Sequence, residues 1–238
     1  MRENTLKQRL YAGKAAFGVM CTFPAPAVVE MLGHLGFDWI LLDNEHGSIT
    51  VDTAEACIAA AELTGIAPIV RPVGNKPEII APFLDRGAWG VQVPHVNTAD
   101  EARAAVAAVK YSPEGQRGIF SGGRAAGYGF KGTTADYARE ANHQTLVCLM
   151  LEEVEAIENL PEMVTVPDLV SGSMASSATC SLAAPSSAAK SFDHGSPRRS
   201  TVSRAAATSS VETGWTCLLG CARATTASFV FTVRSSCR

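Results

Sequence analysis

The sequence predicts an α/β fold with a parallel sheet, as either a (β/α)8 TIM barrel or an open doubly wound sheet. Over residues 1–168, short apolar runs alternate with amphipathic stretches, the pattern of successive right-handed βαβ units. No G-x-G-x-x-G opens a helix after the first strand and no G-x-x-x-x-G-K-[ST] occurs, so nucleotide-binding folds lose support. Polar residues follow several apolar runs directly, which favours a barrel with its active site at the strand ends.

The individual elements follow from periodicity and from helix caps. The run FDWILL over 37–42 suits a strand that is buried on both faces. Thr50 is a plausible N-cap, and the stretch over 98–110 combines a cap, strong helix formers and acidic residues in its first turn. In order, we expect a helix over 25–36, a strand over 37–42, a helix over 50–63, a strand over 67–70, a helix over 76–85, a strand over 89–93, a helix over 98–110, a glycine-rich loop over 115–132, a helix over 133–140, a strand over 145–151 and a helix over 153–159.

Composition excludes several classes of protein. A length of 238 residues suits one large domain, and the net charge of −3 argues against a nucleic-acid binder. No apolar run has the length of a membrane span, and the polar amino-terminal segment lacks the features of a signal peptide. We therefore expect a cytoplasmic protein with neither a nucleic acid nor a membrane as partner. No C-x-x-C pair occurs, and Cys21, Cys57 and Cys148 are expected to be small core residues.

The composition changes abruptly after residue 168. Residues 1–168 hold 21 acidic and 13 basic residues, whereas residues 169–238 hold 2 acidic and 7 basic residues. Serine rises from 3 residues in the first segment to 16 in the second, and isoleucine disappears. We therefore divide the chain into the amino-terminal part of a barrel, 1–168, and an aberrant Ser/Ala-rich tail, 169–238, that is disordered or frameshifted.

Four of the expected strands run directly into polar residues. In a parallel barrel these carboxyl ends meet on one face, where catalytic groups lie. A histidine, an arginine and a carboxylate at that face suit metal-assisted proton transfer on a carboxylate-bearing substrate. The residues that follow the strands are Asp43, Asn44, Glu45 and His46 after the first, Arg71 after the second, His95 after the third and Glu152 after the fourth.

Each of these residues also has a purely structural interpretation. Asp43 could cap the following loop, His46 could be a solvated loop residue, and Glu152 could be the first residue of its helix. Arg71 is harder to explain in this way, because an arginine directly after a buried strand needs an anionic partner. Three further residues are interpreted from the spacing alone as structural: Asp85, His95 and His34.

Four segments resemble the HpcH/HpaI class II aldolases, and the resemblance covers about residues 4–168. The segments are FDWILLDNEHG, IVRP, GAWGVQVPHVNTADEARAAVAAVKYSPEGQRG and LMLEEVEAIENLPEM. The resemblance implies a TIM barrel of the phosphoenolpyruvate/pyruvate type, left incomplete after residue 168. It also implies reversible cleavage of a 4-hydroxy-2-oxo acid to pyruvate and an aldehyde, with a divalent metal (Mg²⁺, Mn²⁺ or Co²⁺) and a homo-oligomeric assembly.

The resemblance assigns roles to individual residues. His46 matches the acid/base that works through water, and Arg71 matches the arginine that stabilises the enolate. Glu152 matches the first metal carboxylate, and Asp43 and Asp85 match the aspartates that orient the histidine. These roles suit the chemistry, because an enolate needs cationic stabilisation and a histidine titrates near neutral pH.

The second metal carboxylate of the family is missing from this sequence. Where the family continues with a strand and an Asp-Leu pair, residues 166–185 read VPDLVSGSMASSATCSLAAP. A frameshift explains this break: in the shifted frame Met174-Ala175 would encode glycine, and 178–180 could encode Asp-Leu. An intact reading frame at the locus would contradict this hypothesis. The chain as written is expected to have weak or no activity.

Two other functions stay open on the sequence. A carbon–carbon lyase of the citrate-lyase β type, acting on CoA thioesters, would share the metal carboxylate and Arg71. The segment around His46 favours the aldolase. The second alternative is an inactive, truncated or frameshifted pseudoenzyme.

Overall fold

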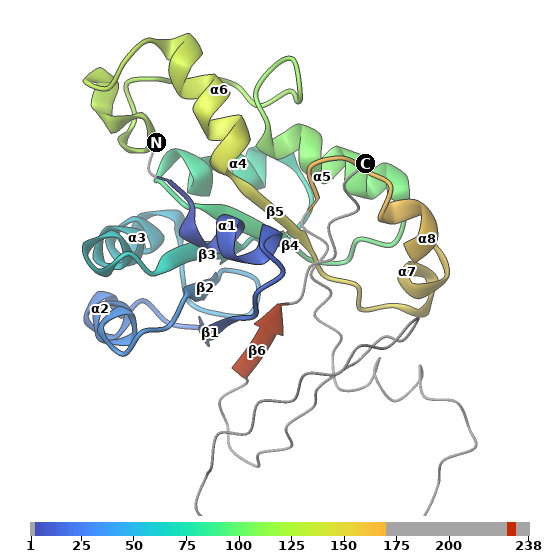
Figure 1. The fold of residues 1–238 in the computed structure, drawn as a ribbon, viewed down its shortest axis with the longest axis horizontal. Helices are drawn as coiled ribbons and strands as arrows, with labels where there is room; N and C mark the ends of the chain where they lie inside the picture. Colours follow the sequence, from blue (N-terminus) through green and yellow to red (C-terminus); the bar gives the residue numbers. More distant parts are fainter. Residues whose placement is uncertain (1–2, 170–227, 232–238) are drawn as a thin grey trace, which may run out of the picture.

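A computed structural model of the chain describes residues 3–169 and 228–231, and its central feature is a six-stranded sheet. The strands follow the order β5-β4-β3-β2-β1-β6 (Figure 1). From β1 to β5 each strand pairs in parallel with the next strand in the sequence. The bounds are β1 Ala16–Cys21, β2 Trp39–Asp43, β3 Ala67–Arg71, β4 Gly90–Val93, β5 Leu146–Leu149 and β6 Ser228–Phe231.

This strand order decides between the two sheet types that the sequence left open. A doubly wound sheet reverses its strand order at a switch point, whereas a barrel adds each strand beside the one before it. The order from β1 to β5 never reverses. Leu169 also forms a parallel bridge to Val147 at the outer edge of β5, where the next barrel strand would pair. The predicted TIM-barrel architecture is confirmed for the described part of the chain.

The described part of the tail adds one strand to the other edge. β6 pairs antiparallel with β1, in a register that places Ala16 opposite Phe231 and Val19 opposite Ser228. The sequence analysis expected no sheet element in this segment, so β6 is a difference between expectation and structure. The expectations for 170–227 and 232–238, among them the missing second carboxylate, lie outside the described residues.

The helices alternate with the strands along the chain, as the sequence predicts. Thr50, Thr98 and Thr133 each accept a hydrogen bond from a backbone N–H group in the first turn of the helix that follows. Among the described residues, no helix combines the length and apolar character that crossing a membrane requires. The helices are α1 Thr5–Tyr11, α2 Pro26–His34, α3 Val51–Thr64, α4 Pro77–Asp85, α5 Ala99–Val109, the 3-10 helix η1 Arg124–Gly129, α6 Thr134–Gln144, α7 Val154–Glu158 and α8 Leu160–Met163.

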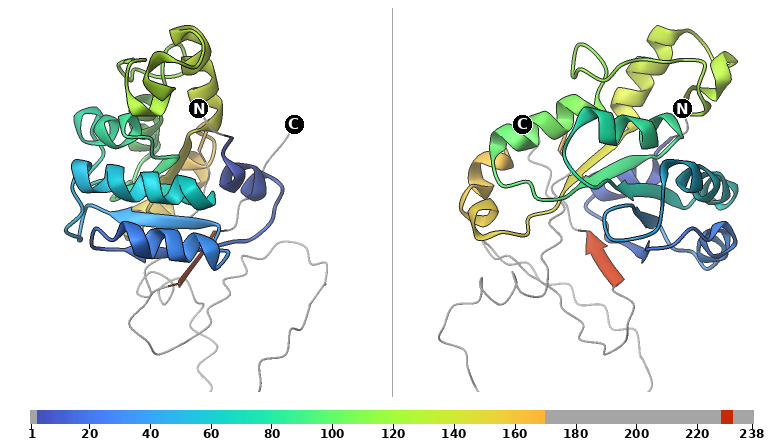
Figure 2. Two further views of the ribbon diagram at one scale, coloured as in Figure 1. Left: turned by 90° about the vertical axis from the view of Figure 1, so that its left-hand side faces the viewer. Right: turned by 180° about the vertical axis from the view of Figure 1, so that it is seen from behind.

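Both faces of the parallel strands are buried. Side chains alternate between the faces, so Ile40 and Leu42 pack against the outer helices while Leu41 packs on the inner face. Leu6 and Leu10 of α1 belong to the inner cluster, so α1 covers the face opposite to α2–α5 (Figures 1 and 2). This two-sided burial explains why the strands are continuous apolar runs.

The structure corrects several of the expected element bounds. Neither α1 nor β1 was expected from the sequence. β1 is hard to recognise because it contains Gly18 and lacks a continuous apolar run. α6 extends to Gln144, four residues beyond the expected end. β5 is shorter than expected, α7 lies within the last expected helix, and α8 is a further short helix beyond its expected end.

Candidate active site at the carboxyl ends of the strands

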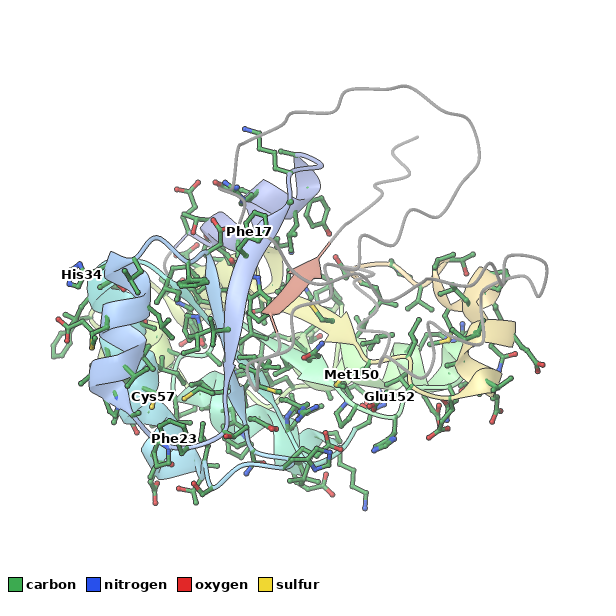
Figure 3. The ribbon with its side chains drawn as sticks, turned by 90° about the horizontal axis from the view of Figure 1, so that it is seen from below. Phe17, Phe23, His34, Cys57, Met150 and Glu152 are labelled. Carbon is green, nitrogen blue, oxygen red and sulfur yellow. The ribbon has the colours of Figure 1, made fainter. Side chains whose placement is uncertain are left out.

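Charged side chains meet where β2, β3 and β5 end. The register between β2 and β3 pairs Asp43 with Arg71, the last residue of each strand. Both are inner-face residues, because Leu42 and Val70 before them pack against the outer helices. The chain beyond β5 adds Met150 and Glu152, which lie near each other in Figure 3. The expected convergence of polar groups at the strand ends is therefore present.

Asp43 and Arg71 form a buried, bidentate ion pair. Arg71 Nε donates to Asp43 Oδ1 at 2.8 Å, and Arg71 Nη2 donates to Asp43 Oδ2 at 2.7 Å. The Asp43 side chain is fully buried, and that of Arg71 is 7% exposed. Burial alone would raise the pKa of Asp43, but the hydrogen bonds from Arg71 and from the His46 backbone outweigh it and lower the pKa. The anionic partner that the sequence required for Arg71 is confirmed.

Asp43 also holds the loop that follows β2. Its Oδ1 accepts the backbone N–H groups of Glu45 at 3.1 Å and of His46 at 3.2 Å. These bonds go to the main chain, so Asp43 fixes the position of His46 through its backbone. Asp43 therefore caps the loop that follows it, as one interpretation of the sequence expected, and it also pairs with Arg71.

Glu45 lies between Arg71 and two histidines. Its Oε2 is 3.3 Å from Arg71 Nε and 3.8 Å from His46 Nε2, and its Oε1 is 3.2 Å from His95 Nε2. The side chain is only 9% exposed, and Oε2 has no hydrogen-bond partner, since the single Nε–H of Arg71 is directed at Asp43. The sequence analysis placed Glu45 in the strand-end motif but gave it no role.

His95 is the second residue that the sequence analysis underestimated. Its Nδ1 is 3.6 Å from Glu152 Oε2 and 3.3 Å from Glu153 Oε1. It has a backbone φ of 53°, a left-handed conformation that a non-glycine residue adopts at a cost. Burial alone would lower the pKa of His95, but the surrounding carboxylates, led by Glu152, outweigh it and raise the pKa. Its position directly after a barrel strand was the signal available in the sequence.

His46 contacts Glu45, and Glu152 contacts His95. The His46 side chain is 69% exposed, and its Nε2 atom is 3.8 Å from Glu45 Oε2. Glu152 precedes α7, which begins at Val154 with Glu153 as its N-cap, so Glu152 is not the first residue of that helix. Its side chain is 24% exposed, and Oε2 is buried without a hydrogen-bond partner.

Asp85 lies away from this site within the chain. It is the last residue of α4, which runs back from the carboxyl end of β3 toward the start of β4. Its carboxylate binds Arg117 at 2.5 Å, and Arg117 stacks over Tyr111 at 4.6 Å from the ring centroid. Within the described part of one chain, Asp85 therefore does not contact His46, because α4 places Asp85 at the other end of the sheet.

His34 and the three described cysteines lie outside the group of charged residues at the strand ends. His34 is at the outer end of α2, with its side chain 73% exposed, and it lies far from Glu152 in Figure 3. Cys21, Cys57 and Cys148 are buried and free, as the sequence predicts. Burial raises the pKa of Cys148 to about 12, so its thiol is neutral.

Comparisons with known proteins agree with this arrangement. Residues 18–180 match the family described as HpcH/HpaI aldolase/citrate lyase. The chain is 37% identical over 163 residues to a pyruvate aldolase of Rhizobium etli, covering 68% of this chain and 63% of that protein. It is 38% identical over 165 residues to a 4-hydroxy-2-oxo-heptane-1,7-dioate aldolase of Escherichia coli, covering 69% of this chain and 62% of that protein. The chain thus spans less than two thirds of the length of these relatives.

The solved structures include close matches in fold. An HpcH/HpaI aldolase/citrate lyase family protein of Burkholderia cenocepacia J2315 superposes with a TM-score of 0.66 and 28% sequence identity. The match covers 70% of this chain and 66% of that one.

Proposed function

Because this chain belongs to the HpcH/HpaI aldolase/citrate lyase family, we propose that it is an aldolase that reversibly cleaves a 4-hydroxy-2-oxo acid to pyruvate and an aldehyde. The observation that carries the proposal is the buried Asp43–Arg71 pair at the strand ends, with Glu45, His46 and Glu152 around it. These groups lie where a barrel enzyme binds its substrate.

The proposed reaction breaks the bond between C3 and C4 of the substrate. The 4-hydroxyl group loses its proton, the aldehyde leaves, and the electron pair of the broken bond stays on the pyruvate unit as an enolate. A proton then adds at C3 to give pyruvate. The negative charge that develops on the enolate oxygen must be stabilised by cationic or hydrogen-bonding groups.

Arg71 is suited to that stabilisation. Two of its nitrogens are held by Asp43, which fixes the plane of the guanidinium group. Among the described residues, its Nη1 donates to the thioether sulfur of Met150, at 3.7 Å. A thioether is a weak acceptor, so this N–H group can exchange it for a substrate oxygen. His46 is the proposed acid/base, because its ring is exposed beside Glu45 at the carboxyl end of β2.

The described residues provide one carboxylate, that of Glu152, that suits a divalent cation. Among them, no three His, Cys, Asp or Glu side chains are placed to hold one ion. The buried Oε2 atoms of Glu152 and Glu45 nevertheless lack hydrogen-bond partners, and Mg²⁺ needs only one or two carboxylates besides water. We infer that Glu152 would hold Mg²⁺, Mn²⁺ or Co²⁺, which when bound would polarise the substrate carbonyl. Homo-oligomeric assembly stays a prediction from the family resemblance, and a cytoplasmic location stays a prediction from the sequence.

The proposal is tested by pyruvate release from a 4-hydroxy-2-oxo acid with Mn²⁺ present. We expect slow but measurable turnover by the 238-residue chain. Arg71→Met should lower kcat/KM by about 100-fold or more, because it removes the cation that faces the enolate. Arg71→Lys should retain part of the rate, because it keeps the charge but loses the bidentate geometry.

The matched control is Arg139→Met, which changes an arginine of α6 whose side chain is 77% exposed. It should leave the rate unchanged. Each variant is first compared with the native chain by its melting temperature. A folded Arg71→Met variant that cleaves the substrate at the native rate would rule out this site.

A further inference from the structure

Gln92 on β4 carries a buried side chain that the proposed reaction does not use. The residue is 0% exposed, and neither its Oε1 nor its Nε2 atom has a hydrogen-bond partner among the described residues. Burying an amide without partners destabilises a fold, and native proteins rarely retain one without a reason. A group that is absent from the free chain can supply the missing partner.

The sheet register places Gln92 beside Arg71. Val91 and Val93 pack against the outer helices, so Gln92 between them faces the inside of the barrel. Val91 pairs with Val70, and the next residue on each strand is Gln92 and Arg71. On its other side Gln92 pairs with Cys148 of β5. Gln92 therefore belongs to the inner layer that ends at the guanidinium group.

One nitrogen of the neighbouring Arg71 also lacks a strong acceptor. Arg71 Nη1 faces Met150 Sδ at 3.7 Å, and Arg71 Nη2 faces Met20 Sδ at 3.7 Å in addition to its bond with Asp43. The Cys148 thiol is neutral, because burial raises its pKa to about 12. Arg71 Nη1 and the Gln92 amide thus offer N–H donors that have no strong acceptor, and carboxylate or carbonyl oxygens could accept from them.

We propose that Gln92 is a substrate-binding residue whose side-chain amide, together with Arg71, hydrogen-bonds the oxygen atoms of a small 2-oxo carboxylate. This assignment rests on the proposed function for its ligand class. It adds a residue of β4, level with Arg71 in the sheet register, and it explains why a buried amide has no partner within the described chain. An apolar residue there would bind the same ligand more weakly and would pack better in its absence.

Gln92→Met tests the assignment, because it removes the amide while nearly conserving the volume. Pyruvate is the probe, and its dissociation constant is measured by calorimetry on the full chain with and without Mg²⁺, alongside the melting temperature. We expect pyruvate binding to weaken about tenfold. The melting temperature should stay the same or rise, because an unpaired amide has been removed. The control is Gln116→Met, the same change at an exposed loop residue, which should alter neither quantity.

A purely structural role for Gln92 gives the opposite pattern. The melting temperature would then fall while pyruvate binding stays at the native value, and this result would overturn the assignment. Gln92→Leu serves as a second variant if the methionine variant does not fold. Failure of the native chain to bind pyruvate would also overturn the assignment of Gln92. If pyruvate binds and Gln92→Met weakens it, but no aldol cleavage occurs, the proposed reaction fails and the binding role of Gln92 stands.

Discussion

Asp43 is the residue that connects most of the candidate site. It binds the guanidinium group of Arg71 through both carboxylate oxygens and the loop of Glu45 and His46 through two backbone N–H groups. One fully buried carboxylate therefore positions both the proposed enolate-stabilising group and the proposed acid/base. The protonation state of Asp43 should therefore affect how stably Arg71 and the loop of Glu45 and His46 are held.

Asp43→Asn should destabilise the protein by about 3–5 kcal/mol near neutral pH, because it leaves Arg71 buried without its charged partner. The pKa of Asp43 is lowered from its ordinary value of 3.8. The stability that this group contributes is therefore fully present above about pH 4 and is lost as the pH falls through the lower, folded-state value. Urea unfolding at several pH values should show the gap between native and variant narrowing in acid.

The matched control for this series is Asp100→Asn, at the start of α5, whose side chain is 90% exposed. It should cost less than about 1 kcal/mol, from its interaction with the helix dipole and a surface pair. A gap for Asp43→Asn that stays constant down to the lowest pH would show that its carboxylate is not stabilised by folding.

At the scale of secondary-structure elements, the close approach of β1 to β2 is the feature that sequence patterns missed. Gly18 pairs with Trp39 across the two strands, and the Trp39 indole ring lies against the glycine. A Cβ atom at position 18 would overlap the Trp39 ring and its backbone carbonyl. The glycine that obscures β1 in the sequence is thus what allows the large Trp39 side chain to fill the inner face.

Gly18→Ala should destabilise the protein by about 1–3 kcal/mol, because the added methyl group has to displace the packed Trp39 ring or its strand. The measurement is the midpoint of urea unfolding, with the quenching of buried tryptophan fluorescence as a second readout. Gly118→Ala is the control, since its added Cβ atom would meet nothing within 4 Å and its backbone is not in the left-handed region. Equal midpoints for the two variants would contradict the packing seen at β1.

At the scale of the whole molecule, two apolar clusters share the five parallel strands. The outer cluster joins the strands to α2–α5, and the inner cluster joins them to α1 (Figure 2). Because four of the five strands contribute residues to both clusters, and β4 contributes Val91 and Val93 to the outer one, loss of one cluster exposes the other. The described barrel segment should therefore unfold as one unit.

The full chain should show a single cooperative melting transition, with the same midpoint by far-UV circular dichroism and by tryptophan fluorescence. Trp39 and Trp89 are buried in the inner cluster and report on it directly. Trp215→Phe removes the third tryptophan, which lies outside the described residues, so the remaining signal comes from the barrel. Two separate midpoints, or a melt without a transition, would favour the inactive pseudoenzyme that the sequence left open.

The sequence by itself determined the alternation of strands and helices, the capping threonines and the strand-end positions of Asp43, Arg71 and Glu152. These features depend on local periodicity and on the chain directions of a parallel sheet, so a linear sequence contains them. The resemblance in the same segments identified the family, which the comparisons confirm.

Only the tertiary structure decided which side chains meet. Glu45 and His95 lie together because they follow β2 and β4, whose carboxyl ends lie at the same edge of the sheet. Asp85 lies away from them because α4 runs back to the other end of the sheet. Gln92 acquires its unpaired, buried amide only through the register of β3, β4 and β5. Such contacts depend on strand register and on the path of each connection between strands, and no local pattern of residues records either one.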